Sequence, residues 1–377
     1  MKYTGKKYLI LLLVLSLSFI IIFTPSSGEI IKVSSNSGKN ATLCSSVASG
    51  EDFRISSRLW ELLFGNSANA KTTGSKVLLI AGGSIFGAKI KQTHITVCDP
   101  GNAKELKAGD KIICVNGKEI YSVSELKKAV KECGEKEVEL ICQRGEKRIC
   151  AKIYPSLNNG EFSLGIVLKD GAAGIGTITY IDPETGLFGG LGHGICDPET
   201  GELIEMAAGD VTGVILGGVK RGESGNPGEL SGILTDKVIG TLYANTECGV
   251  FGKLDKIPQN SNAISIEIAH RDEVHDGEAT IISTVRSGKA HEFKIHISDV
   301  NAASTGTKSF KIKATDPTLT AITGGVVRGM SGSPIIQDGK LVGAVTHVMV
   351  ADPTEGYGIF IENMLNAAQQ GIQPQAA

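Results

Sequence analysis

The chain has 377 residues, of which 48 are glycine, 5% are aromatic and the formal net charge at pH 7 is −2. This length exceeds one average domain and predicts two globular units after an N-terminal extension. The near-balanced charge provides no basic field of the kind that draws proteins to nucleic acid, so we expect polypeptide partners and no nucleic acid. Short β-branched runs between turn residues favour strands over helices.

Residues 1–24 have the pattern of an export segment. Lysines at positions 2, 6 and 7 precede the uncharged stretch Tyr8–Phe23, which is rich in Leu and Ile. A positive flank before an apolar stretch is typical of a signal whose N-terminus stays in the cytoplasm, so we expect the remainder to cross the membrane. Sixteen residues fall short of a comfortable bilayer span and no Ala-x-Ala site follows. Cleavage and retention both stay open, and we favour an uncleaved anchor.

Residues 25–74 are rich in Ser, Asn, Lys and Thr and predict a linker, with one apolar patch at 60–64. Eight cysteines are scattered along the chain without any Cys-x-x-Cys pair. This spacing does not favour a zinc site, and buried free thiols are the preferred interpretation over disulfides. We expect no metal and no other cofactor.

Residues 75–155 predict a small unit with one helix. Ser122–Glu125 forms a capping box that opens the helix, and Gly134 stands where it would end. A glycine-rich loop lies at 82–87, and the turn Ala-Gly-Asp-Lys-Ile-Ile-Cys-Val-Asn-Gly occupies 108–117. Strand-like runs at 138–143 and 148–154 follow the helix.

This order of elements resembles the PDZ domain of bacterial exported proteases. The resemblance implies that the backbone amides of Ile85, Phe86 and Gly87 capture a C-terminal carboxylate. The bound peptide would then add as a strand between residues 88–92 and the helix that begins at Val123. The alternative is a small α/β domain without a free groove.

Residues 160–377 predict a second, mainly β domain. Short apolar runs follow one another, and turns of the type Asp-Pro-Glu-Thr-Gly at 182–186 and 197–201 bracket one of them. Regular short strands of this kind favour a β-barrel or a pair of barrels.

The strongest chemical signal is Gly-Met-Ser-Gly-Ser-Pro at 329–334, followed by an apolar run, an Asp-Gly turn and a second apolar run. A serine between glycines at a bend exposes its hydroxyl beside backbone N–H groups, which an acyl-transfer nucleophile needs. Ser331 is therefore the predicted nucleophile. The N–H groups of Gly329 and Ser331 are the predicted oxyanion hole.

The general base that activates Ser331 is expected to be one of the seven histidines. His193 stands between glycines at the end of an apolar strand and is the first choice, while His347, sixteen residues after the nucleophile, is the alternative base or a pocket residue. Asp316, at the end of a strand before the nucleophile loop, is the predicted acid that orients the imidazole. Asp182 and Asp197 occupy hairpin turns, where carboxylates usually serve the turn.

Residues 329–343 resemble the nucleophile loop and hairpin of chymotrypsin-like peptidases, with Met330 where that family has Asp and Ser333 where it has a second Gly. These motifs, together with Leu-Gly-His-Gly at 191–194 and Ser-Gly-Asn-Pro-Gly-Glu at 224–229, make residues 75–365 similar to the stage IV sporulation protein B family. In that family the matching residues are a catalytic His, Asp and Ser, here His193, Asp316 and Ser331.

The resemblance implies an exported serine endopeptidase that is made in the forespore and faces the space between the two spore membranes. There it would cleave the regulatory partner of a membrane-embedded protease and so trigger a mother-cell sigma factor. Members are also implied to cut themselves near the N-terminus, under control of the PDZ domain.

Two other function classes are weighed against this one. A PDZ adaptor with an inactive peptidase-like barrel remains the alternative, since residues 193 and 331 need not meet in space. A metal-dependent hydrolase is disfavoured because no His-Glu-x-x-His or Cys-x-x-Cys spacing is present.

Overall fold

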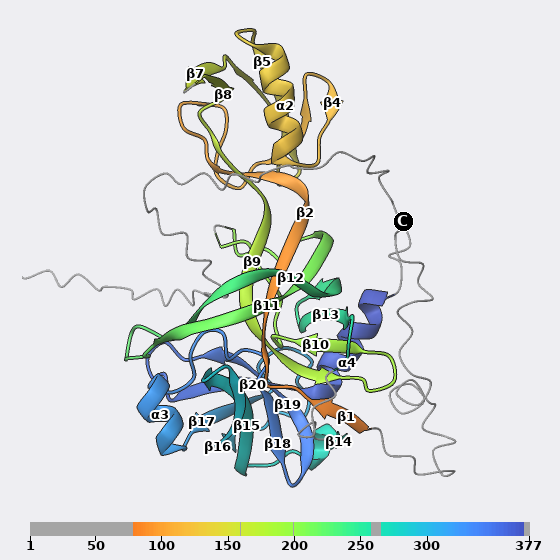
Figure 1. Cartoon of the computed structure of the whole chain (residues 1–377), viewed down its shortest axis with the longest axis vertical. Coiled ribbons are helices and arrows are strands. Elements are labelled where there is room, and N and C mark those ends of the chain that lie inside the picture. Colours follow the sequence, from red (N-terminus) through yellow and green to blue (C-terminus); the bar gives the residue numbers. More distant parts are fainter. Residues whose placement is uncertain (1–77, 159, 199, 258–264, 373–377) are drawn as a thin grey trace, which may run out of the picture.

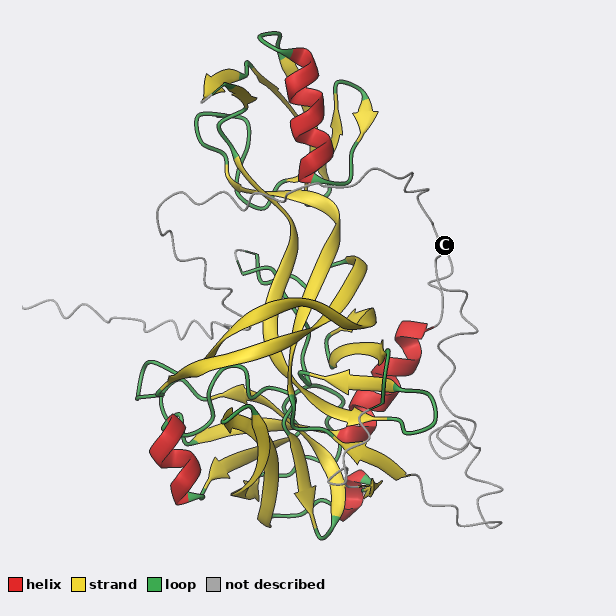
Figure 2. Ribbon diagram, viewed as in Figure 1, coloured by secondary structure: helices red, strands yellow, loops and turns green. Residues whose placement is uncertain are grey.

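The computed structural model describes residues 78–158, 160–198, 200–257 and 265–372. The predicted export segment, the linker and its apolar patch lie outside these residues. Within them the protein is mainly β, as predicted, and none of the helices is long and apolar enough to span a bilayer. Figure 2 shows how few helices accompany the strands.

Figure 1 shows a small upper unit joined to a larger lower unit by two long strands, β2 and β9. The small unit contains β3 (Lys111–Val115), β4 (Lys118–Glu119), α2 (Val123–Cys133), β5 (Val138–Arg144), β6 (Lys147–Ile153), β7 (Ser156–Asn158) and β8 (Glu161–Ser163). The large unit contains β1 (Leu78–Ala81), β10 (Leu187–Gly190), β11 (Met206–Lys220), β12 (Glu229–Thr246), β13 (Gly249–Leu254), β14 (Ser265–Ile268), the 3₁₀ turn η1 (Arg271–Glu273), β15 (Gly277–Arg286), β16 (Lys289–Ser298), β17 (Phe310–Ala314), α3 (Pro317–Thr323), β18 (Pro334–Gln337), β19 (Lys340–Val348), β20 (Glu355–Phe360) and α4 (Ile361–Ile372).

The predicted helix of the small unit is present with both predicted ends. The side chain of Ser122 accepts a hydrogen bond from the N–H of Glu125, and the Glu125 carboxylate accepts one from the N–H of Tyr121. Gly134 ends the helix with φ of 61°. Leu126 and the other apolar side chains of α2 pack on a core that extends from Ile95 to Leu168.

Strands β2 (Ile85–Asp99) and β9 (Val167–Ile181) run through both units as an antiparallel pair, from Ile85 opposite Thr177 to Asp99 opposite Val167. In the large unit β11 pairs with the other edge of β2, from Thr212 opposite Gly87 to Met206 opposite Gln92. The two units are therefore connected by continuous sheet.

This arrangement makes the predicted peptide-binding role of Ile85, Phe86 and Gly87 wrong. All three residues lie in β2 and pair with β9, and Gly87 also pairs with β11. Phe86 is fully buried, with its ring centroid 5.6 Å from that of Phe188. Backbone groups already engaged in a sheet cannot capture a carboxylate. The glycine-rich stretch before them is instead the turn from β1 into β2.

The predicted boundary at residue 75 also shifts. Residues 78–91 pair with strands of the large unit, while the core of the small unit begins at Ile95. The small unit is thus inserted between β2 and β9, two strands that pair with each other in the large unit. The chain leaves the large unit along β2 and returns to it along β9.

In the large unit the strands are joined by hydrogen-bonded pairs into a closed arrangement around apolar clusters. The predicted hairpin after the nucleophile is present: β18 pairs with β19 from Pro334 opposite Ala344, and Asp338 and Gly339 form the turn with φ of 51° and 74°. Strand β10 lies between the two Asp-Pro-Glu-Thr-Gly turns, as the sequence predicts.

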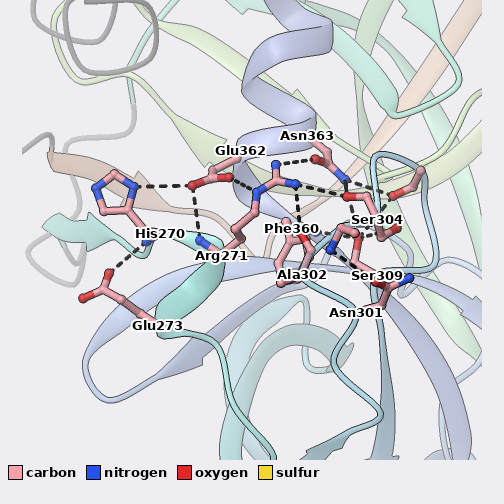
Figure 3. A network of polar contacts seen from close by, with 12 residues as sticks. His270, Arg271, Glu273, Asn301, Ala302, Ser304, Ser309, Phe360, Glu362 and Asn363 are labelled. Carbon is pink, nitrogen blue, oxygen red and sulfur yellow. Dashed lines mark hydrogen bonds and ion pairs between the residues drawn. The ribbon is translucent and has the colours of Figure 1, made fainter. Parts of the chain in front are cut away.

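Helix α4 is joined to η1 and to the segment 302–309 by the polar contacts in Figure 3. Arg271 of η1 forms an ion pair with Glu362 and donates to the Asn363 amide oxygen at 3.0 Å. The same guanidinium donates to the carbonyls of Ala302 and Ser304, both at 3.3 Å. The network therefore holds the segment 301–309 against α4.

No disulfide joins any of the seven described cysteines. Only Cys142 is fully buried, and Cys150 is exposed, so the expectation of burial is wrong for Cys150. Cys44 lies outside the described residues.

Candidate active site

The nucleophile loop between α3 and β18 packs directly on β9. Gly329 and Gly332 both have φ of 93°, a conformation that side chains with a Cβ rarely adopt. A Cβ at Gly332 would lie 2.0 Å from the carbonyl oxygen of Thr177 and 2.5 Å from the nitrogen of Leu191. Glycine is required here because the loop touches two backbone segments at once.

The Ser331 hydroxyl donates a hydrogen bond of 2.8 Å to the carbonyl of Thr346, in β19. The hydroxyl is therefore close to the strand that also carries His347. To act as a nucleophile, Ser331 must exchange this carbonyl for a base.

His193 lies just after β10, in the loop that begins with Leu191 at φ of 66°. The residue is 6% exposed, and its Nδ1 is 2.9 Å from the carbonyl oxygen of Gly194. Because a carbonyl only accepts, this contact assigns the proton of the neutral ring to Nδ1 and leaves Nε2 as the basic nitrogen. Burial lowers the pKa of His193, and the Gly194 carbonyl offsets part of that effect. The ring is thus held neutral, as a general base must be.

His347 lies beside His193, with ring centroids 5.3 Å apart. Burial, together with repulsion by His193 and Lys308, lowers the pKa of His347 to about 3. Its buried Nδ1 has no hydrogen-bond partner among the described residues. Such a ring stays neutral at physiological pH. The roles of His347 as a pocket residue or as the alternative base stay predictions.

Strand β19 thus links three of the predicted residues, Ser331, His193 and His347. Thr346 contacts Ser331 and the next residue, His347, contacts His193, so adjacent positions of β19 touch the nucleophile and the base. A Cβ at Gly192, next to His193, would lie 3.0 Å from the Thr346 side chain. Ser331 and His193, 138 positions apart in the sequence, are therefore both in contact with consecutive residues of β19.

Asp316 is engaged elsewhere in this structure. Its carboxylate caps α3 and accepts hydrogen bonds from the N–H groups of Thr318 at 2.8 Å, Leu319 at 3.1 Å and Lys294 at 3.3 Å. Burial acts to raise the pKa of Asp316, but these donors lower it on balance. Its role as the acid that orients His193 stays a prediction. The Gly194 carbonyl performs the orientation seen here.

The two other aspartates considered from the sequence serve their turns. Asp182 accepts from the N–H of Glu184 at 2.9 Å, and Asp197 accepts from the N–H of Thr200 at 3.3 Å. Asp197 also forms an ion pair of 3.0 Å with Lys169.

The predicted oxyanion donors are available. The carbonyl of Arg328 accepts from the N–H of Leu230 at 2.8 Å, and the carbonyl of Met330 accepts from the N–H of Ser333 at 2.9 Å. In a trans peptide the N–H lies opposite the carbonyl, so these two bonds also set the directions of the following N–H groups. Those N–H groups belong to Gly329 and Ser331, and neither donates to any acceptor in the described part of the chain.

An open strand edge was missed from the sequence. Residues 167–171 of β9 pair with β2 on one side only, within the described ranges, and α2 lies along the other side. The Asp170 carboxylate accepts from the N–H of Val123 at the start of α2, at 2.8 Å. A cavity of about 480 Å³ adjoins this contact, lined in part by Lys89 and Lys91. In the sequence, the glycine at position 165 could have indicated a turn into this strand. In the structure Gly165 has a φ of 66° and lies just before β9.

Comparison with known proteins gives two family matches and no match among curated proteins. A PDZ domain family matches residues 100–144, within the small unit. Solved structures also resemble the chain at low sequence identity. The active form of the Rv3671c protease from M. tuberculosis is 13% identical over 55% of this chain and 77% of its own, with a TM-score of 0.31.

The HtrA-type protease AlgW with a tripeptide is 14% identical over 53% of this chain and 56% of its own, with a TM-score of 0.32. The family described as SpoIVB peptidase S55 matches residues 160–365, which contain the nucleophile loop, both active-site histidines and the hairpin after Ser331. Since this match spans more than half of the 377 residues, the chain belongs to the SpoIVB peptidase S55 family and is a serine peptidase.

Proposed function

We propose that this protein is an endopeptidase in which Ser331 is the nucleophile and His193 is the general base. The proposal rests on the contacts of both residues with β19. The Ser331 hydroxyl donates to the carbonyl of Thr346, and the His193 ring lies beside the ring of His347. With the proton of neutral His193 on Nδ1, Nε2 is the nitrogen that would accept the proton of the Ser331 hydroxyl.

The reaction follows from this arrangement. Ser331 Oγ bonds to the substrate carbonyl carbon while its proton passes to His193, and the oxyanion accepts from the N–H groups of Gly329 and Ser331. His193 then gives the proton to the leaving amine as the peptide bond breaks. Water releases the acyl group by the same steps in reverse order.

We further propose the biological setting that the sporulation family suggests. The substrates are the chain itself, cut within the polar stretch 25–74, and a membrane-associated regulatory protein whose cleavage triggers mother-cell sigma factor activation. The protein would be exported across, or anchored to, the forespore inner membrane and would face the intermembrane space. The apolar stretch Tyr8–Phe23 after the lysines supports this location.

The small unit is proposed to recruit these protein substrates by strand addition. The open edge of β9 at residues 167–171, beside α2, has the backbone groups that an extended peptide requires. This edge replaces the one at residues 88–92 expected from the sequence, which is occupied by β9 and β11.

The test compares Ser331→Ala with Ser333→Ala. Both serines lie in one loop, and the buried Ser333 hydroxyl has no partner among the described residues, so its removal leaves the fold intact. We expect Ser331→Ala to lose labelling by a fluorophosphonate, self-cleavage seen by mass spectrometry of the N-terminus, and substrate cleavage. Ser333→Ala should retain all three.

Undiminished cleavage by folded Ser331→Ala would remove the proposal. A wild-type protein that is folded but never labelled, under conditions where it binds C-terminal peptides, would instead support the non-catalytic adaptor.

A further inference from the structure

One buried residue of β9, Thr177, contacts both halves of the catalytic site. Its N–H donates to the carbonyl of Ser331 at 2.9 Å, and its Oγ1 donates to the carbonyl of Gly329 at 2.9 Å. Its own carbonyl accepts from the N–H of Leu191 at 3.2 Å, in the loop that carries His193. Thr177 is fully buried, so water does not compete for these bonds.

The side-chain bond fixes one particular peptide group. The peptide between Gly329 and Met330 separates the two peptides whose N–H groups form the oxyanion hole. Its carbonyl is held by Thr177 Oγ1, and its N–H donates to the carbonyl of Val327 at 3.1 Å. Gly329 has no Cβ, so its backbone has the freedom to rotate if the Thr177 bond is lost. Rotation there would redirect the N–H of Gly329 or of Ser331.

The main-chain hydrogen bonds of Thr177 hold the Ser331 loop and the His193 loop in fixed positions relative to each other. The peptide after Ser331 is held from both ends, with its carbonyl on Thr177 N–H and the N–H of Gly332 on the carbonyl of Val345 at 2.7 Å. Leu191 is bound to the other side of the same Thr177 residue. A single strand position therefore sets how the Ser331 loop lies relative to the His193 loop.

We propose that Thr177 is a positioning residue for catalysis, whose hydroxyl holds the oxyanion loop in its productive conformation. This inference rests on the proposed function of Ser331 and His193. Thr177 itself touches neither substrate nor the reacting hydroxyl. Loss of its hydroxyl therefore weakens stabilisation of the transition state, which lowers kcat, and leaves KM unchanged.

The test uses Thr177→Val, which replaces the hydroxyl by a methyl group and keeps the β-branched shape. Thr177→Ser retains the hydroxyl and is the rescue variant. Thr284→Val is the matched control, because the Thr284 hydroxyl is equally buried and donates to a glycine carbonyl, that of Gly83, at 2.8 Å. Measurements are the rate of fluorophosphonate labelling, kcat and KM on a peptide substrate, and the unfolding midpoint.

Removal of an oxyanion donor costs about 100-fold or more in kcat, so misplacing the donors should cost about tenfold in kcat and in labelling rate for Thr177→Val. Thr284→Val should lower the unfolding midpoint to a similar degree but keep the wild-type rates. Thr177→Ser should restore most of the activity.

Equal rates for folded Thr177→Val and Thr284→Val, or failure of Thr177→Ser to restore activity, would overturn the assignment. Should Thr177→Val not fold, Thr177→Ala is compared with Thr284→Ala by the same criteria. If the wild-type protein is never labelled, the proposed function itself is refuted. If the wild-type protein is labelled and the Thr177 variants are labelled at the same rate, only the role of Thr177 is refuted.

Discussion

At the scale of single residues, the site depends on the close approach of two backbones. The nucleophile loop lies so near β9 that Gly332 has no room for a Cβ, and its φ of 93° is unfavourable for any other residue. The Ser333 side chain, at the position where the chymotrypsin-like pattern has a second Gly, is fully buried.

Gly332→Ala should abolish labelling by a fluorophosphonate and destabilise the large unit. The added methyl group would meet the Thr177 carbonyl at 2.0 Å, so the loop must move away from β9. Gly339→Ala is the control, because Gly339 has a similar φ of 74° but open space around its Cβ position. Normal labelling of Gly332→Ala would show that the loop does not need this contact.

At the scale of elements, β9 connects the open edge at residues 167–171, where we propose that peptides bind, to the loops of Ser331 and His193. Asp170, near the start of the strand, binds the N-terminus of α2, and Thr177 in the same strand binds the loops of Ser331 and His193. The residue that contacts the small unit's helix and the residue that contacts the nucleophile loop are thus only seven positions apart in one strand.

Asp170→Asn should loosen the start of α2. A carboxylate at a helix N-terminus accepts from free N–H groups and interacts favourably with the helix dipole, so the loss should cost about 1 kcal/mol of helix stability. Hydrogen exchange of the Val123 amide measures this directly. Asp99→Asn, which affects only a local bond to Gly101, is the control. Unchanged exchange at Val123 would contradict the capping role.

At the scale of the whole molecule, two histidines shielded from water, His193 and His347, make folding depend on pH. The pKa of His347 is lowered to about 3 by burial, by His193 and by Lys308, and burial also lowers the pKa of His193 from 6.5. Between pH 6.5 and about 3 the unfolded chain binds a proton at His347 that the folded chain does not. Stability should therefore decrease as the pH falls below 6.5.

Denaturant midpoints at pH 7.5, about 5.5 and about 4.5 would measure this loss, since the unfolded imidazole titrates near 6.5. His347→Gln removes the titrating group and should flatten the dependence, while the half-buried His291, outside the site, can be changed in the same way as a control. An identical pH dependence for wild type and His347→Gln would show that His347 is not buried neutral.

The sequence alone determined the features that depend on neighbouring residues. The capping box at Ser122, the hairpin after Ser331 and the glycine-flanked His193 are local patterns, because turns and caps are set by the backbone conformations of a few residues. The mainly β class and the peptidase chemistry follow from the same patterns.

Only the tertiary structure decided which distant segments share a surface. The stretch Ile85–Gly87 has the composition of a binding loop, yet pairing with β9 and β11 places it inside a sheet. Asp316 lies shortly before the nucleophile loop in the sequence, which made it the predicted acid. In the structure its carboxylate caps α3. Thr177 has no motif at all, and its importance comes from the strand pairing that carries it between the two catalytic loops. Long-range pairing selects one register among many, and no local pattern specifies that choice.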